Sequence, residues 1–229
     1  MSDDTFIPSP GKVRPGQLIA SFGPGSLVQT KYDSVLILGI DFWNNTEKYM
    51  EKNHPYLAKL TGKKSFRMPM QKKPTQRNIA CSSFPTWGFC KYCKKLQRKF
   101  SKPQNKKGIH LCDVHKTKGV LLPARLLVTC EKGHLDDFPW HYFVHRGNNS
   151  CRGTLRFFES GASLQTENLW VKCSCGASRS LAQAFGKSGK ENLPSCRGRH
   201  PHLDHFDHEC KEEPRAVLLG ATNSWFPIT

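Results

Sequence analysis

The chain has 229 residues, and its 35 Lys or Arg against 18 Asp or Glu give a formal net charge of +17. This length allows one large domain or two small ones. Such an excess of positive charge favours a polyanionic partner, most commonly nucleic acid. Hydrophobic residues make up only 37% of the chain and cysteines number 10, so we expect bound metal to reinforce a modest core.

The sequence has no apolar run of the roughly 18 residues that a membrane-spanning helix needs, so no membrane partner is expected. It begins with a polar, acidic stretch, Met1 to Asp4, which does not resemble a secretory signal peptide. Cysteine-rich chains without a leader are more often zinc proteins than disulfide scaffolds. We therefore expect a cytoplasmic protein that binds metal.

The elements expected in the first third are short. Residues 15–22 predict a helix with a proline in its first turn. The apolar run 35–43 predicts a strand. Residues 46–60 predict a helix interrupted near Pro55. Residues 61–78 contain six bases and no acid, which is typical of a solvated loop.

Two close pairs of metal-ligating residues follow. Cys90 and Cys93 are separated by two residues, as are Cys112 and His115, and a loop of 18 residues lies between the pairs. Each pair supplies two ligands from one turn, and the loop allows the turns to meet around a tetrahedral Zn²⁺. Buried thiol pairs or disulfides are the alternative for the same spacing.

The loop between the pairs is the most basic part of the chain. From Lys91 to Lys118 it contains ten Lys or Arg and a single acid, Asp113, with Tyr92 and Phe100 interleaved. A positive surface of this kind suits contacts with phosphates that do not depend on sequence, although scattered lysines can also be an ordinary soluble surface. The expected nucleic-acid contacts are Lys91, Lys94, Lys95, Arg98, Lys99, Lys106 and Lys107.

In the second half, extended segments are expected at 119–130, 155–159, 169–175 and from 216 onward. A short helix is expected over 180–185, capped by Ser178 or Ser180.

The remaining cysteines predict further metal sites. A second Zn²⁺ set is expected at Cys173, Cys175, Cys196 and Cys210, where Cys-x-Cys-Gly is typical of a metal-binding turn. One histidine of the tract at 200–208 could replace a cysteine there. A weaker third set is Cys130, His134, His145 and Cys151. Ordinary buried cysteines, or a histidine that only caps a turn, are the alternatives.

No motif for nucleotide hydrolysis is present. The glycines at 23–25 lack the lysine of a phosphate-binding loop, and no Gly-x-Ser-x-Gly turn occurs. Residues 134–141 gather two carboxylates and two imidazoles, which could hold a divalent ion for phosphodiester hydrolysis but could equally begin a turn. We therefore expect a protein that is not an enzyme, with a metal-dependent nuclease as the alternative.

These observations predict an α+β fold in which a zinc-ribbon-like finger is inserted in a small mixed, strand-rich, zinc-stabilised domain. The expected divisions are an N-terminal helix and strand region at 1–85, the finger at 86–118 and a Cys/His-rich α+β region at 119–229.

Several strings together resemble the N-terminal part of the DrmB family. They are VRPGQLIASFGPGSLV at 13–28, FPTWGFCKYC at 84–93, LVTCEKGHLDDFPWHYFVHRG at 127–147, CSCGASRSLAQAFG at 173–186 and PRAVLLGATNSWFP at 214–227.

DrmB proteins are subunits of the bacterial DISARM antiphage defence system. The resemblance implies a zinc-containing partner of a superfamily 2 helicase, acting on DNA with a single-stranded portion. It also implies zinc ligation by the matching cysteines, while it supplies no catalytic residue. Proteins of this family continue past the point that matches Thr229, so we expect a split subunit, a short relative or a fragment. A second chain could then carry the C-terminal part. A pure protein-assembly module is a further alternative.

Overall fold

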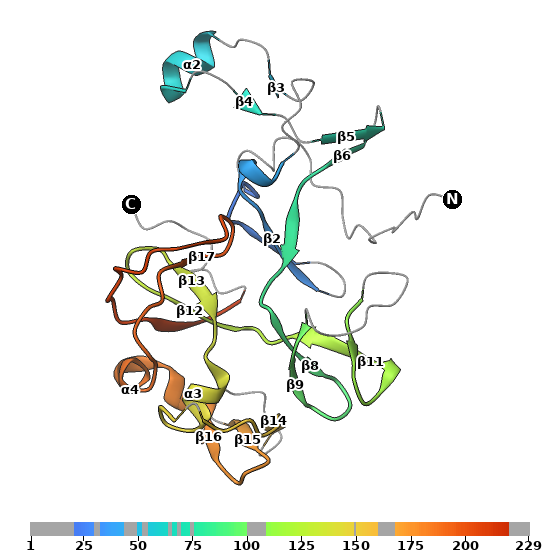
Figure 1. Ribbon diagram of the computed structural model, residues 1–229, viewed down its shortest axis with the longest axis vertical. Coiled ribbons are helices and arrows are strands. Elements are labelled where there is room, and N and C mark those ends of the chain that lie inside the picture. Colours follow the sequence, from blue (N-terminus) through green and yellow to red (C-terminus); the bar gives the residue numbers. More distant parts are fainter. Residues whose placement is uncertain are drawn as a thin grey trace.

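The computed structural model describes residues 21–29, 33–43, 50–51, 55–63, 66–67, 70–73, 76–99, 109–148, 150–159 and 168–219. Over these residues the chain forms many short strands and few helices, which confirms a strand-rich α+β chain. Each strand pair that joins two of the described strands is antiparallel, and the strands form several small sheets rather than one large one (Figure 1). The expected helix at 15–22 lies almost entirely outside the described residues.

The first sheet has the order β1-β2-β7, from β1 (Leu27–Gln29), β2 (Ser34–Ile37) and β7 (Cys81–Ser83). The strand expected over 35–43 is shorter than predicted, since β2 ends at Ile37 and the 3₁₀ helix η1 (Ile40–Phe42) follows. The chain turns at Gly39, whose N–H donates to the His202 carbonyl at 2.7 Å. A Cβ here would lie 2.8 Å from the Leu203 side chain, so glycine allows this close approach.

A peripheral part follows, at the top of Figure 1. It contains the hairpins β3 (Met50–Glu51) with β4 (Phe66–Arg67) and β5 (Met70–Lys73) with β6 (Gln76–Asn78), and the helix α2 (Pro55–Thr61). Pro55 opens α2 instead of interrupting a longer helix, as its fixed φ and missing N–H favour. The basic stretch expected as a loop therefore contains strands.

The finger is a four-stranded sheet of order β10-β11-β8-β9. Its strands are β8 (Trp87–Cys90), β9 (Leu96–Arg98), β10 (Leu111–Cys112) and β11 (Lys116–Pro123). Two hairpins, β8 with β9 and β10 with β11, are joined by pairing of β11 with β8. The segment expected as one strand over 119–130 divides after Pro123, because the next strand joins a different sheet.

That next sheet has the order β13-β12-β19 and is formed by β12 (Leu126–Thr129), β13 (Leu135–Asp137) and β19 (Arg215–Leu218). It places the end of the described chain beside its middle, since all four residues of β19 pair with β12. The short helix α3 (Trp140–Val144) follows β13.

A further sheet has the order β14-β15-β16, formed by β14 (Leu155–Glu159), β15 (Leu169–Cys173) and β16 (Ser178–Ser180). The helix expected at 180–185 is the 3₁₀ helix η5 (Leu181–Ala184), and the Ser180 hydroxyl caps it by accepting the Ala182 N–H at 3.3 Å. The remaining elements are α4 (Gly186–Glu191), β17 (Arg199–His200) and β18 (His205–Phe206).

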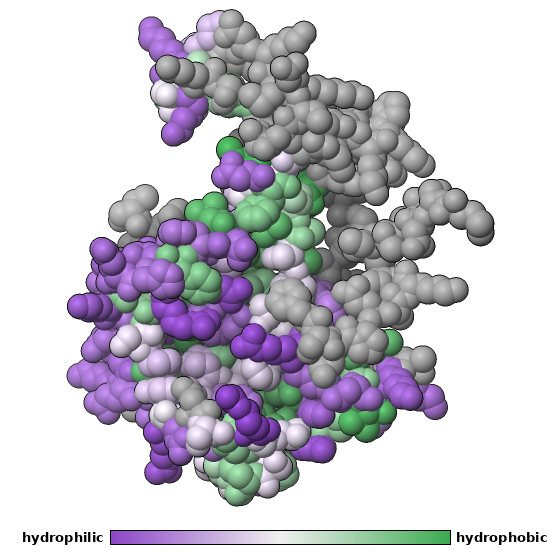
Figure 2. Space-filling view, viewed as in Figure 1, coloured by the Kyte–Doolittle hydropathy of each residue, from purple (hydrophilic) through white to green (hydrophobic). Residues whose placement is uncertain are grey.

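Two apolar clusters hold these sheets together. The larger one surrounds Trp140 and Phe143 of α3 and draws on β9, β12, β14 and β15. The other joins Leu27 and Leu36 of the first sheet to Leu127 and Val217 of the sheet around β12. The beginning and the end of the described chain therefore share a core. Figure 2 shows hydrophilic side chains over the region of α4 and β17, with more apolar residues toward η1 and β2.

Candidate metal centres

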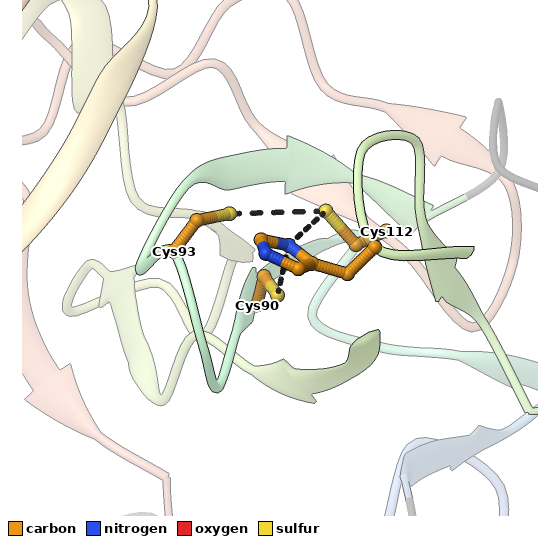
Figure 3. A group of neighbouring side chains, drawn as sticks. Cys90, Cys93 and Cys112 are labelled. Carbon is orange, nitrogen blue, oxygen red and sulfur yellow. Dashed lines mark hydrogen bonds between the residues drawn. The ribbon is translucent and has the colours of Figure 1, made fainter. Parts of the chain in front are cut away.

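The first cluster lies in the finger, where the structure brings Cys90, Cys93, Cys112 and His115 together with all four ligand atoms within 4.8 Å of one another. Figure 3 shows the labelled cysteines reaching a common centre from two hairpins. The Sγ atoms of Cys93 and Cys112 are 3.8 Å apart, and His115 Nδ1 lies 3.7 Å from Cys90 Sγ. A disulfide needs about 2.05 Å, so these thiols are not bonded to each other.

These separations fit one metal ion. Zinc–sulfur bonds of about 2.3 Å and zinc–nitrogen bonds of about 2.0 Å in a tetrahedron place two sulfurs about 3.8 Å apart and a sulfur and nitrogen about 3.5 Å apart.

Hydrogen-bond donors surround the sulfurs of the finger. Gln97 donates its amide N–H to Cys112 Sγ at 3.2 Å. Burial raises the pKa of the Cys112 thiol, but the backbone N–H of His115, the His115 ring and further donors outweigh burial and bring the pKa to about 6. Donors aimed at sulfur favour the thiolate, which is the form that ligates metal.

The second cluster combines Cys130 and His134 with Cys196 and Cys210, and its ligand atoms again lie within 4.8 Å of one another. His134 Nδ1 is 3.3 Å from Cys130 Sγ and 3.6 Å from Cys196 Sγ. The other ring nitrogen of His134 faces Asp207 Oδ2 at 3.6 Å. A carboxylate behind a ligating histidine orients the ring and increases its basicity.

Without a bound cation, the second cluster disfavours ionisation of its thiols. Burial raises the pKa of the Cys196 thiol to about 12, the Gly198 N–H opposes that rise, and the thiols of Cys130 and Cys210 add to it. Sulfurs held this close repel one another when ionised. A bound divalent cation would reverse the balance by stabilising the thiolates.

The third cluster contains His145, Cys151, Cys173 and Cys175. The Sγ atoms of Cys151 and Cys173 are 3.7 Å apart, and His145 Nε2 is 3.4 Å from Cys175 Sγ. His145 Nδ1 lies 2.7 Å from the His141 carbonyl oxygen, which can only accept. Nδ1 therefore carries the proton, and the lone pair of Nε2 is directed at the cluster.

A backbone N–H also favours the ionised thiol of one cysteine in this cluster. The Ala177 N–H, followed by the His145 ring, lowers the pKa of the Cys175 thiol to about 6.

The structure corrects the grouping of the second and third sets. Cys173 and Cys175 do not share a cluster with Cys196 and Cys210, and the set of Cys130, His134, His145 and Cys151 is likewise divided between two clusters. Antiparallel pairing of β12 with β19 carries the C-terminal cysteines back to the β12–β13 turn, so neighbours in sequence serve different clusters. His134, and none of the histidines at 200–208, completes the second cluster.

A repeated string, which our sequence predictions did not use, carries a signal of this arrangement. Cys-Arg-Gly occurs at 151–153 and again at 196–198, once in each cluster. In both copies the glycine N–H donates to the cysteine sulfur at 3.3 Å. Two copies of the same turn predict two separate sites, one for each copy.

Every cluster thus has three cysteines and one histidine. The nine cysteines concerned form no disulfide, and Cys81 is the tenth, outside the clusters.

Two glycines allow the ligands to approach one another. A Cβ at Gly153 would lie 2.4 Å from Cys173 Sγ and 3.2 Å from Cys151 Sγ. A Cβ at Gly119 would lie 2.5 Å from the Cβ of His115 and 2.8 Å from that of Cys112. Since no real Cβ makes such contacts, only glycine fits at these two positions.

Comparison with known proteins gives the chain its family. Residues 14–226 match the family described as a domain of unknown function, DUF8724. The chain belongs to the DUF8724 family. It is also 32% identical over 203 residues to DISARM protein DrmB of Bacillus paralicheniformis (strain ATCC 9945a / NCIMB 11709 / CD-2). The resemblance to DrmB inferred from sequence strings is therefore confirmed.

The match covers 85% of this chain but 35% of that relative, so the chain spans about a third of the relative's length. All three clusters lie within the residues of the DUF8724 match. The described helices include none with the length and apolarity needed to cross a membrane.

The basic residues of this DUF8724 chain fall into different environments. Lys91 and Arg98 are exposed, and Lys94 and Lys95 are half-buried. Lys95 Nζ is paired with Asp113 at 2.8 Å. The structure adds exposed bases beside these, Lys116, Lys118 and Arg156, which the sequence reasoning left out. The side chain of Arg156 donates to the Cys93 carbonyl at 3.2 Å. Lys106 and Lys107 lie outside the described residues.

The prediction that Lys99 contacts phosphates at the surface is wrong. Its side chain is fully buried, and its Nζ lies 2.5 Å from Asp33 Oδ1 of the first sheet. Burial lowers the pKa of Lys99, and Asp33 opposes that effect. Lys99 directly follows β9, and its buried charge is compensated by Asp33.

The two carboxylates of the 134–141 segment, Asp136 and Asp137, accept hydrogen bonds from two arginines and a threonine. Asp136 accepts from Arg197 at 2.6 Å and from Arg199 at 2.7 Å. Asp137 accepts the Thr86 N–H at 2.6 Å and also contacts Arg199. Neither carboxylate belongs to a described metal cluster. Their role in this structure is to join β13 to its neighbours.

Proposed function

We propose that this chain is a non-catalytic, zinc-binding subunit of an antiphage defence complex, which binds DNA without sequence preference and partners a superfamily 2 helicase. The observation that carries the proposal is the convergence of three Cys/His sets, each with the spacing of a tetrahedral ion, in the region similar to DrmB.

The ligand chemistry favours structural zinc. Three thiolates and one imidazole form a Cys₃His set, a type common in structural zinc sites, in which four protein ligands leave no position for substrate. Because each set joins chain segments that are otherwise held by short strands, metal binding would contribute directly to folding. The zinc-ribbon-like character of the finger is part of this proposal, as is the division at 1–85, 86–118 and 119–229.

The charge distribution supports the DNA-binding part. Around the finger, the exposed bases Lys91, Arg98, Lys116 and Lys118 face only one described acid of the segment, Asp113, which is already paired with Lys95. Acids gather instead near the second cluster, where Glu212 and Glu213 pair with lysines. A positive surface separated from the acidic one attracts the phosphate backbone.

The contacts of two carboxylates support the non-catalytic part of the proposal. The carboxylates of residues 136 and 137 are bound by Arg197, Arg199 and Thr86, so they do not present free oxygens to a catalytic metal. The helicase, DNA with a single-stranded portion, and a second chain carrying a C-terminal part are the proposed partners. They come from the resemblance to DrmB proteins.

Metal analysis and DNA binding test the proposal separately. Purified reduced protein should contain about three zinc ions per chain. A triple variant, Lys91→Glu, Arg98→Glu and Lys118→Glu, should weaken binding to labelled single-stranded and duplex DNA and reduce the slope of log affinity against log salt. The matched control reverses three lysines on the acidic side, Lys132→Glu, Lys187→Glu and Lys211→Glu.

Equal effects of the two triple variants would remove the finger from the DNA-binding surface. Tight binding of a helicase subunit by protein that does not bind DNA at all would favour the pure assembly module.

A further inference from the structure

A second positive feature lies away from the finger, in a pocket of about 430 Å³ lined by Tyr142, Arg146, Arg179, Gln183, Glu191 and Asn192. Its lining residues lie in or beside α3, β16, η5 and α4. Of these elements, α3, β16 and α4 are labelled in the lower part of Figure 1. Its size is within the range of small-molecule sites, roughly 300–1,000 Å³.

Arg179 is the central residue of this pocket. It is only 7% exposed, and its side chain donates three hydrogen bonds to neutral acceptors. Nε donates to Gln183 Oε1 at 2.9 Å, one terminal nitrogen donates to the Phe143 carbonyl at 2.9 Å, and the other donates to Asn192 Oδ1. Among the described residues it has no carboxylate within ion-pair distance. A buried guanidinium without a counter-charge is costly, and an anion in the pocket would compensate it.

The guanidinium is also held in one orientation. Besides the three acceptors, the face of the Phe143 ring lies 4.7 Å from its central carbon. An arginine has five N–H donors, so one N–H on each terminal nitrogen is left over after these bonds. Two N–H groups of one guanidinium can bind two oxygens of a phosphate together. A fixed fork needs little ordering when a ligand binds.

The rim of the pocket adds a second cation. Arg146 is exposed, and among the described residues its side chain has no ion-pair partner. Its backbone has a φ of 51°, a conformation that residues other than glycine seldom adopt. Such a backbone conformation is tolerated where neighbouring contacts hold the chain, and the ring of the adjacent His145 contacts the His141 carbonyl and Cys175. Arg146 also acts on Arg179, because burial first and Arg146 second lower the pKa of the Arg179 guanidinium.

Glu191 is the one acid of the lining, and it restricts what can bind. It is exposed and forms no ion pair with either arginine in the described part of the chain. The pocket therefore contains two cations and one anion. We propose that this pocket binds a phosphate group, either at the 5′ end of a nucleic-acid strand or on a free mononucleotide, with Arg179 as the bidentate contact and Arg146 as the second charge.

This proposal is independent of the finger, because the pocket shares no residue with the basic surface near Lys91. The first measurement compares a single-stranded oligonucleotide carrying a 5′-phosphate with the same strand carrying a 5′-hydroxyl, by fluorescence anisotropy. The 5′-phosphate should raise affinity about tenfold, as one or two charge-assisted hydrogen bonds would. The second arm titrates dTMP and follows the side-chain N–H resonance of Arg179 by NMR.

Arg146→Gln should abolish the preference for the 5′-phosphate, and Glu191→Gln should increase it severalfold by removing the like charge. Arg152→Gln is the matched control, since Arg152 is exposed but outside the lining. Each source has its own signature. A shifted Arg179 resonance with dTMP supports a free mononucleotide, and a preference confined to the oligonucleotide supports a strand end. An Arg146→Gln protein that keeps the wild-type response to both probes, or a wild-type protein that responds to neither, overturns the proposal.

Discussion

His145 Nε2 lies 3.4 Å from Cys175 Sγ, across 30 positions of sequence, and this contact joins α3 to the turn after β15. The same turn was expected to share its metal with Cys196 and Cys210. The contact therefore places Cys175 in the cluster of His145. Because each cysteine belongs to one cluster, cysteine variants should differ in how much metal the protein loses.

The grouping can be tested by metal content. Cys173→Ser with Cys175→Ser should remove one metal ion per chain, because both residues belong to one cluster. Cys173→Ser with Cys196→Ser should reduce content by up to two ions, since it damages two clusters. Mass spectrometry of native, reduced protein counts the ions directly. If the two double variants lose the same amount, and Cys173→Ser with Cys210→Ser also does, the interleaved grouping is incorrect.

The glycines that touch the sulfurs should be intolerant of any side chain. Gly153→Ala would place a methyl group 2.4 Å from Cys173 Sγ, so we expect loss of the third metal ion and about 2 kcal/mol or more of stability. Metal counting with urea denaturation checks this. Gly62→Asn is the control, because that position is open and asparagine tolerates its φ of +66°. Retention of three ions by Gly153→Ala would show that the cluster does not close as the structure has it.

Removing the metal should unfold the part of the chain that depends on it. A strong chelator under reducing conditions should abolish the near-ultraviolet circular dichroism of the buried aromatic residues, and added Zn²⁺ should restore it. The same reductant without chelator should leave the spectrum unchanged, because the cysteines form no disulfide. A spectrum insensitive to chelation, in protein shown to be metal-free, would contradict a structural role.

The buried lysine should matter for folding and not for DNA. Lys99→Met removes the buried cation that compensates the Asp33 carboxylate, and we expect a loss of about 3–5 kcal/mol in the free energy of unfolding. Adding Asp33→Asn should recover part of that loss, because the carboxylate charge that Lys99 compensated is then removed. Urea denaturation gives both values, with exposed Lys118→Met as the control. A cost below about 1 kcal/mol would mean that Lys99 is not buried as described.

Local patterns predicted the local features of this protein well. The two close pairs around Cys90 and Cys112 come together in one finger, because each pair sits in its own hairpin and the hairpins are neighbours in one sheet. Ser180 caps a helical turn as its type predicts. Features that depend on one turn or one hairpin can be read from spacing, since few residues decide them.

Features that depend on contacts between residues distant in sequence were not predictable in the same way. Whether Lys99 faces solvent is set by its contact with Asp33, a residue 66 positions earlier. Whether Cys196 joins Cys130 or Cys173 is set by β19 pairing with β12.

By itself the sequence determined the ligand types, the number of metal-competent residues, the basic character of the finger and the similarity to DrmB. Only the tertiary structure decided which metal-competent residues share a cluster, that Lys99 is interior, and that a buried arginine lines a pocket. The physical reason is that the sequence gives each residue's type and its immediate neighbours directly, whereas long-range contacts depend on how separate strands pair and pack.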